Sequence, residues 1–219
     1  MPLELVPRMG RPFNDNAVFQ QQIPIQVWGW TLPGAEIRVS LDQQKRSAKA
    51  GADGRFDVKF DAMPADKLKS VDDAPAGHSL TVVTRSGGKE ETKTFSNILI
   101  GEVWLCSGQS NMEVKYNSRG TNLDPKRPAL RFLDEACSVS APDTCGRCYS
   151  VSYVFGHKLQ GELLVPVGLI RVKFEHAQHG LMLAKKEGYE PPVCRCRGFR
   201  SRPRPEAGTG LKAKSTARI

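Results

Sequence analysis

Apolar and polar residues alternate with a period of two over several short stretches in the first part of the chain, which is typical of half-buried β-strands. The apolar positions are Ile37, Val39 and Leu41, then Phe56, Val58 and Phe60, with two further strands expected over residues 80–84 and 92–95. Pairs of turn-forming residues separate these stretches, namely Pro33-Gly34, Asp53-Gly54 and Gly87-Gly88. Short strands at this spacing predict a small β-sandwich over about residues 14–96.

The pattern changes after residue 97. A continuous apolar run over residues 98–106 predicts a buried strand, and a helix is expected from Ser110 to about Lys115. Further along, apolar residues recur every four positions at Val151, Phe155, Leu159 and Leu163, and Val154 widens this stripe. The stripe predicts an amphipathic helix that faces a sheet, followed by a buried strand over residues 167–170. Strand, helix and strand in this order favour a parallel sheet.

Ser110 follows the buried strand directly, in the sequence Cys106-Ser107-Gly108-Gln109-Ser110. A serine on a tight strand-to-helix turn presents its hydroxyl above the end of the sheet, where a neighbouring backbone N–H can bind an oxyanion. The alternative is a helix N-cap, because serine commonly satisfies the first amides of a helix. The pattern therefore offers Ser110 as a candidate nucleophile for acyl transfer.

Residues 99–112, Leu-Ile-Gly-Glu-Val-Trp-Leu-Cys-Ser-Gly-Gln-Ser-Asn-Met, closely resemble the nucleophile block of the sialate O-acetylesterases, a family of SGNH hydrolases. Residues 24–34 and 149–170 resemble other parts of the same family, in the same order. The resemblance implies a β-sandwich over residues 14–96 and the start of a flavodoxin-like α/β esterase domain over residues 97–170. It also implies Ser110 as the nucleophile, an acetylated sialic acid as the substrate, and neither a cofactor nor a metal.

Several catalytic parts expected from the resemblance are missing. The family supplies its histidine and aspartate from an Asp-x-x-His block, and no Asp precedes a His by three residues here. The family's oxyanion glycine follows the second strand, where this chain continues as Arg171-Val172-Lys173-Phe174. Its oxyanion asparagine lies in Gly-x-Asn-Asp, and the nearest match, Gly120-Thr121-Asn122, comes too early. His176 and His179 are interpreted as surface residues. We therefore expect this chain to be an incomplete esterase with weak or no activity.

The positive charge is concentrated at the end of the chain. The formal net charge is +9, and residues 194–219 contribute +7 of it through eight Lys or Arg and one Glu. The near-neutral remainder argues against a nucleic-acid partner, although an arginine-rich segment can bind RNA. Arg and Pro recur without a hydrophobic period, so residues 171–219 are expected to be a disordered basic tail. A reading-frame shift near residue 170 is a simpler explanation of this tail.

Other features of the sequence leave alternatives open. Trp28 and Trp30 share one face of a strand, where indoles usually fill a core but can also stack on sugar rings. A non-catalytic carbohydrate-binding sandwich is therefore the alternative function. Cys145-Gly146-Arg147-Cys148 is a lone C-x-x-C motif, which is weak evidence for a metal site. No signal peptide or membrane span is recognisable, whereas relatives of the family are usually exported. The sequence leaves the oligomeric state and the compartment open.

Overall fold

A computed structural model describes residues 3–108, 114–116, 123–133, 138–145 and 149–173 of the 219-residue chain. All of the described residues lie within a first compact unit, residues 1–180. The first unit is mostly β-sheet with one long helix. Within the described ranges, no helix is long and apolar enough to cross a membrane. The expected disordered tail over residues 171–219 falls almost entirely outside these ranges and stays a prediction.

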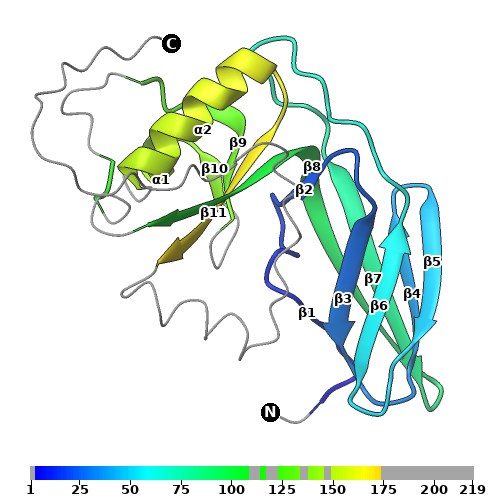
Figure 1. The fold of residues 1–219 in the computed structure, drawn as a ribbon. Coiled ribbons are helices and arrows are strands. Elements are labelled where there is room, and N and C mark those ends of the chain that lie inside the picture. The colour runs from blue at the N-terminus through cyan, green and yellow to red at the C-terminus, as the bar shows by residue number, and fades with distance from the viewer. Residues whose placement is uncertain (1–2, 109–113, 117–122, 134–137, 146–148, 174–219) are drawn as a thin grey trace, which may run out of the picture. The chain divides into compact units, whose positions relative to one another are not determined.

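The strands form two sheets (Figure 1). The smaller sheet is antiparallel, in the order β1 (Arg8–Met9), β3 (Ile25–Trp30) and β6 (Arg55–Phe60). The larger sheet has the order β10 (Ser138–Ser140), β9 (Arg127–Phe132), β11 (Val167–Lys173), β8 (Lys89–Gly108), β7 (His78–Ser86), β4 (Glu36–Leu41) and β5 (Gln44–Lys49). A short strand, β2 (Val18–Gln20), also pairs with β8.

One hydrophobic core lies between the small sheet and the β4, β7 and β8 part of the large sheet. The alternating apolar residues of the sequence supply it, because each strand turns every second side chain inward. Its fully buried members include Val27, Val39, Leu41, Leu80 and Val82. The strands expected over residues 80–84 and 92–95 correspond to parts of β7 and β8.

Strand β8 is longer than the sequence pattern indicated. The separate strands expected over residues 92–95 and 98–106 are joined into one strand of 20 residues. Its first part pairs with β7, and its last part pairs with β11 in parallel register from Glu102 to Gly108. Asn97, at φ 55°, lies between the two parts. The expected domain boundary at residue 97 therefore falls inside β8.

Helix α2 (Ser150–Leu163) covers the parallel strands and closes a second, smaller core. The helix is where the sequence predicted it, but most of the predicted buried face is wrong. Leu159 is half-buried against the small core, as predicted, whereas Val151, Phe155 and Leu163 are exposed. The buried residues of the helix are Ser152, Tyr153, Gly156 and Gln160. Gly156 lies so close to β11 that an added Cβ would be 2.6 Å from Leu169 Cδ1. The face of α2 that contains Gly156 therefore packs against the sheet, because only a residue without a side chain allows so close an approach. The apolar stripe does not determine which face is buried.

Five of the described strands were not predicted from the sequence: the short β1 and β2, and β5, β9 and β10. Strand β5 is polar except for Ala48 and pairs with β4 at the end of the sheet order, while β9 contains Pro128 and buries Arg127 and Arg131. Strand β10 has three residues and pairs with β9. The expectation of a helix reaching Lys115 is also wrong, because Lys115 forms a β-bridge with Tyr149. A single-turn helix, α1, spans Pro142–Cys145.

Candidate active site

The candidate site lies where the parallel strands end. Strand β11 pairs in parallel with β8 on one side and with β9 on the other, so all three end at the same edge of the sheet. Ligands of open α/β sheets bind outside the carboxyl ends of such strands. Gly108 is the last residue of β8, two positions before Ser110. The described structure thus brings the chain to the carboxyl end of the parallel strands directly before the candidate nucleophile.

Ser110 itself lies in residues 109–113, outside the described ranges. The structure fixes the chain on both sides of this segment. On the near side, β8 is paired with β11 as far as Gly108, opposite Lys173. On the far side, the Val114 carbonyl accepts a hydrogen bond of 2.8 Å from the Ser150 N–H, at the first residue of α2. The segment containing Ser110 therefore runs from the end of β8 to Val114, which is hydrogen-bonded to the first residue of α2.

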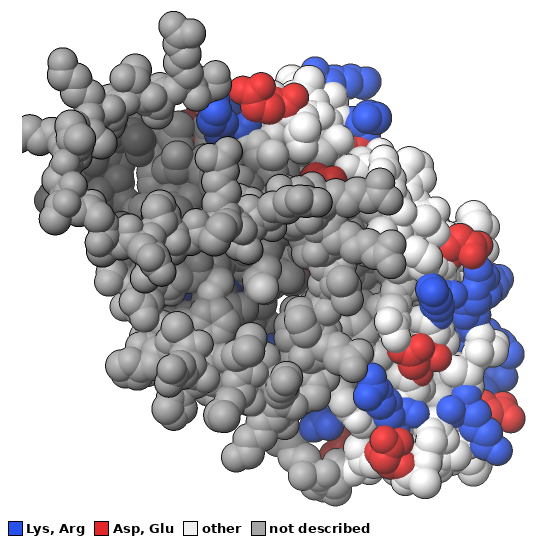
Figure 2. Space-filling view, viewed as in Figure 1, with Lys and Arg blue, Asp and Glu red and all other residues white. Residues whose placement is uncertain are grey.

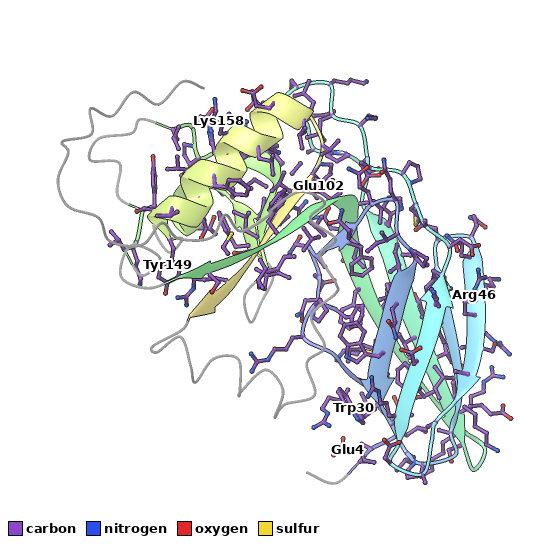
Figure 3. All side chains as sticks on the ribbon, viewed as in Figure 1. Glu4, Trp30, Arg46, Glu102, Tyr149 and Lys158 are labelled. Atoms are coloured by element: carbon purple, nitrogen blue, oxygen red, sulfur yellow. The ribbon has the colours of Figure 1, made fainter. Side chains whose placement is uncertain are left out.

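A cation–π pair lies beside this end of the sheet. The Arg171 guanidinium carbon is 3.6 Å from the ring centroid of Tyr149, the N-cap residue of α2. Arg171 lies opposite Cys106 in the register of β11 and β8, and Figure 3 shows Tyr149 where α2 begins. Sequence patterns gave no signal for this contact, because Tyr149 precedes the helix and Arg171 was assigned to the tail. The pair places one positive charge near the candidate site.

Cys106 is a neighbouring thiol but a poor candidate nucleophile. It is a free cysteine, half-buried against the small core beneath α2. Burial raises the pKa of the Cys106 thiol, so the reactive thiolate is disfavoured at neutral pH. The chemistry expected at this edge therefore rests on the serine.

Neither described histidine is available as a general base. His157, on α2, faces the Asp124 carbonyl through Nε2 at 3.2 Å and the Arg127 guanidinium through Nδ1 at 3.5 Å. Burial, followed by the charge of Arg127, lowers the pKa of His157. Arg127 begins β9, so His157 lies toward the opposite end of the parallel strands from Gly108. His78 bonds two aspartates at the start of β7.

The other sequence candidates are not brought together by the described structure. His176, His179 and Gly120-Thr121-Asn122 lie outside the described ranges, as does Cys148 of the C-x-x-C motif. Where the family's oxyanion turn was expected after residue 170, β11 instead continues to Lys173. Among the residues described, no group of His, Cys, Asp and Glu is arranged to hold a metal ion. On the face shown in Figure 2, acidic and basic side chains are interspersed.

The chain is similar to sialate O-acetylesterases at low identity. It is 26% identical to the protein of Pongo abelii and 27% identical to that of Homo sapiens, each over 192 residues that cover 72% of this chain. The Mus musculus protein is 30% identical over 106 residues. The chain spans 35% of the length of the first two relatives and 19% of the third. No protein-family model matches the chain.

A solved structure gives the same indication. The fold is similar to that of a carbohydrate acetylesterase from Xanthomonas citri, with a TM-score of 0.65 and 26% sequence identity. The match covers 77% of this chain and 40% of the Xanthomonas chain. Sequence and structure comparisons thus relate the described β-rich fold to carbohydrate acetylesterases.

Proposed function

We propose that the chain carries the nucleophile portion of a carbohydrate O-acetylesterase, with Ser110 as nucleophile and an acetylated sialic acid as the substrate. The observation that supports this proposal is the position of the two described residues that flank the segment with Ser110: Gly108 ends β8 at the carboxyl end of the parallel strands, and Val114 bonds the first residue of α2. The similarity to sialate O-acetylesterases over 72% of the chain supports the same chemistry.

The proposed reaction is a two-step acyl transfer. The Ser110 hydroxyl attacks the acetyl carbonyl carbon and gives its proton to a base, and the Ser110 N–H binds the oxyanion that forms. Breaking the ester C–O bond releases the sugar oxygen, which takes up the proton. Water then hydrolyses the acetyl-serine and releases acetate. The architecture that we propose for this chemistry is a β-sandwich over residues 14–96 followed by the start of an SGNH-type α/β domain.

We propose that this chain by itself hydrolyses esters weakly or not at all. His78 and His157 both have their ring nitrogens engaged elsewhere, so the described residues offer no base to Ser110. Loss of the base costs about a millionfold in a serine hydrolase, and loss of one oxyanion donor costs roughly a hundred- to a thousandfold. A reading-frame shift near residue 170 explains the missing parts. Sequencing the gene beyond codon 170 and translating every forward frame tests this: Asp-x-x-His in another frame supports the shift, and its absence from all frames refutes it.

A serine-directed fluorophosphonate probe tests the nucleophile separately from turnover. Labelling of the native chain is expected to be weak but measurable, and to disappear in Ser110→Ala. Ser107→Ala is the matched control, because Ser107 is an exposed serine on the same strand end and is expected to leave labelling unchanged. Equal labelling of the native chain and Ser110→Ala would refute Ser110 as the nucleophile. Release of acetate from O-acetylated sialic acid then measures the residual activity.

A further inference from the structure

The outer face of the small sheet carries an aromatic side chain between two arginines. Trp30, on β3, lies directly opposite Arg8 of β1 and Arg55 of β6 in the antiparallel register. Directly opposed residues point to the same face of a sheet, so all three side chains share one face. The core side chain Val27 belongs to the other face. Trp30 is labelled at the end of this sheet in Figure 3.

The two tryptophans of β3 differ in what covers them. Trp28 packs edge-on against Phe13, with ring centroids 4.8 Å apart, and joins the large core. An added Cβ on Gly10 would lie 2.5 Å from Trp28 Nε1, so the adjacent chain covers this indole closely. Trp30 is half-buried and belongs to neither core, and the Arg8 guanidinium carbon lies 5.0 Å from its ring centroid.

Both arginines are exposed, and neither takes part in an ion pair within the described part of the chain. Stacking on Trp30 engages the planar face of the Arg8 guanidinium and leaves its N–H edge available to an acceptor. Of the two acids near Arg55, Asp57 accepts a hydrogen bond of 2.5 Å from Gln26, and Asp53 Oδ1 accepts the backbone N–H of Arg55 at 3.0 Å. Two guanidinium groups without an ion pair among the described residues therefore flank one indole.

We propose that Arg8, Trp30 and Arg55 form a binding surface for a carboxylated sugar residue of a glycan. An indole offers a flat apolar surface for the C–H face of a pyranose ring, and guanidinium groups bind carboxylates through paired N–H donors. Strands β1 and β6 lie on either side of β3, about 10 Å apart, which suits one or two linked sugar rings. This surface requires neither Ser110 nor an acetyl group, so it goes beyond the proposed esterase function.

The test is calorimetric titration of the full chain with trigalacturonate, and with its methyl-esterified form as the uncharged counterpart. The native chain is expected to bind trigalacturonate and to bind the methyl ester at least about tenfold more weakly. Trp30→Ala and the double variant Arg8→Gln, Arg55→Gln are each expected to weaken trigalacturonate binding by about tenfold or more. The basic tail is present in every variant, so its background contribution cancels.

Arg46→Gln is the matched control. Arg46, on β5, also lies over an aromatic ring, 5.6 Å from the Phe60 centroid, but it is already paired with Asp61 at 2.9 Å. Its replacement is expected to leave binding unchanged, and thermal unfolding of each variant shows that loss of binding is not loss of folding. Absence of binding by the native chain, equal binding of the methyl ester, or unchanged binding by both Trp30→Ala and the double arginine variant would overturn the proposal. Equally tight binding of polyuridylate with the same residue dependence would also overturn it, in favour of a general polyanion surface.

Discussion

Replacing His78 with glutamine is expected to destabilise the protein at neutral pH and to have a much smaller effect above pH 9. His78 is the first residue of β7, and its Nδ1 bonds Asp42 while its Nε2 lies 3.0 Å from Asp66 Oδ1. The hydrogen bond with Asp66 raises the pKa of His78 to about 9, and the bond with Asp42 adds to this against the lowering effect of burial. Both ring nitrogens donate when the imidazole is protonated, so the charged form fits between the two carboxylates.

The pKa gives the size and the sign of the effect. A rise from 6.5 to about 9 corresponds, at roughly 1.4 kcal/mol per pKa unit, to at most about 3 kcal/mol of stability. A group whose pKa is raised by folding stabilises the folded protein most when the group is protonated in both the folded and the unfolded protein, which here means below pH 6.5. The contribution decreases as the pH rises from 6.5 to 9 and is lost above about pH 9. The His78 side chain is 19% exposed, so solvent screening is limited.

Urea unfolding, followed by tryptophan fluorescence at pH 6, 7.5 and 9.5, measures this contribution. The free energy of unfolding of the native chain minus that of His78→Gln is expected to be about 2–3 kcal/mol at pH 6 and below about 1 kcal/mol at pH 9.5. Arg85→Gln is the control, because Arg85 pairs with Glu90 on the surface with half of its side chain exposed. Its effect is expected to be below about 1 kcal/mol and nearly constant over this range. A difference for His78→Gln that stays constant, or grows, from pH 6 to pH 9.5 would refute the reasoning.

Two further predictions concern packing, and a third concerns the reactivity of the Cys106 thiol. Gly101→Ala places a Cβ 2.1 Å from the Pro166 carbonyl oxygen and is expected to lower the free energy of unfolding by about 1–3 kcal/mol. Gly161→Ala, on α2, places a Cβ no nearer than 4.0 Å to the neighbouring atoms and is expected to raise that free energy by about 0.5–1 kcal/mol. Urea unfolding measures both. Tyr153→Ala removes a fully buried ring and is expected to cost about 3–5 kcal/mol, against about 0.5 kcal/mol for the exposed neighbour Val154→Ala, measured in the same assay. Cys106, in a chain whose other cysteines are serine, is expected to react with an aromatic disulfide at pH 8 at least about tenfold more slowly than free cysteine; equal rates would contradict its burial.

The sequence predicts strands well where one face is buried. The alternating residues around Val39 and Val58 lie in β4 and β6, and the apolar run after residue 97 lies in β8. Period-two alternation reports burial on one face directly, so a single sequence is sufficient for these strands. The polar strand β5 shows no such pattern, because backbone pairing with β4 holds it in the sheet.

The buried face of α2 could not be predicted from hydrophobic periodicity. Gln160 is fully buried and its side-chain Oε1 accepts a hydrogen bond of 3.4 Å from Arg127 Nη1, while Gly156 allows β11 to approach. Such positions are chosen by hydrogen bonding and steric fit to particular partners, which a single sequence does not reveal. Ser110 was found from its motif, and its side chain lies outside the described ranges, so its role stays a prediction.

The loop between β6 and β7 holds β8, the strand that leads to the candidate site. The Ile100 N–H donates to Asp66 Oδ2 at 2.8 Å, and the Asp66 N–H donates to the Ile100 carbonyl at 2.9 Å. Asp66 also receives the His78 bond, so one carboxylate ties β7 and the loop before it to the middle of β8. On the same loop, the Leu68 N–H donates to the carbonyl of Leu164, the C-cap of α2, at 3.0 Å. Strand β8, which leads to Ser110, and helix α2 are therefore both hydrogen-bonded to one loop of the N-terminal part. Because β8 and α2 hold the described residues that flank the nucleophile segment, we expect the N-terminal part to be a structural component of the proposed active site rather than an independent attachment.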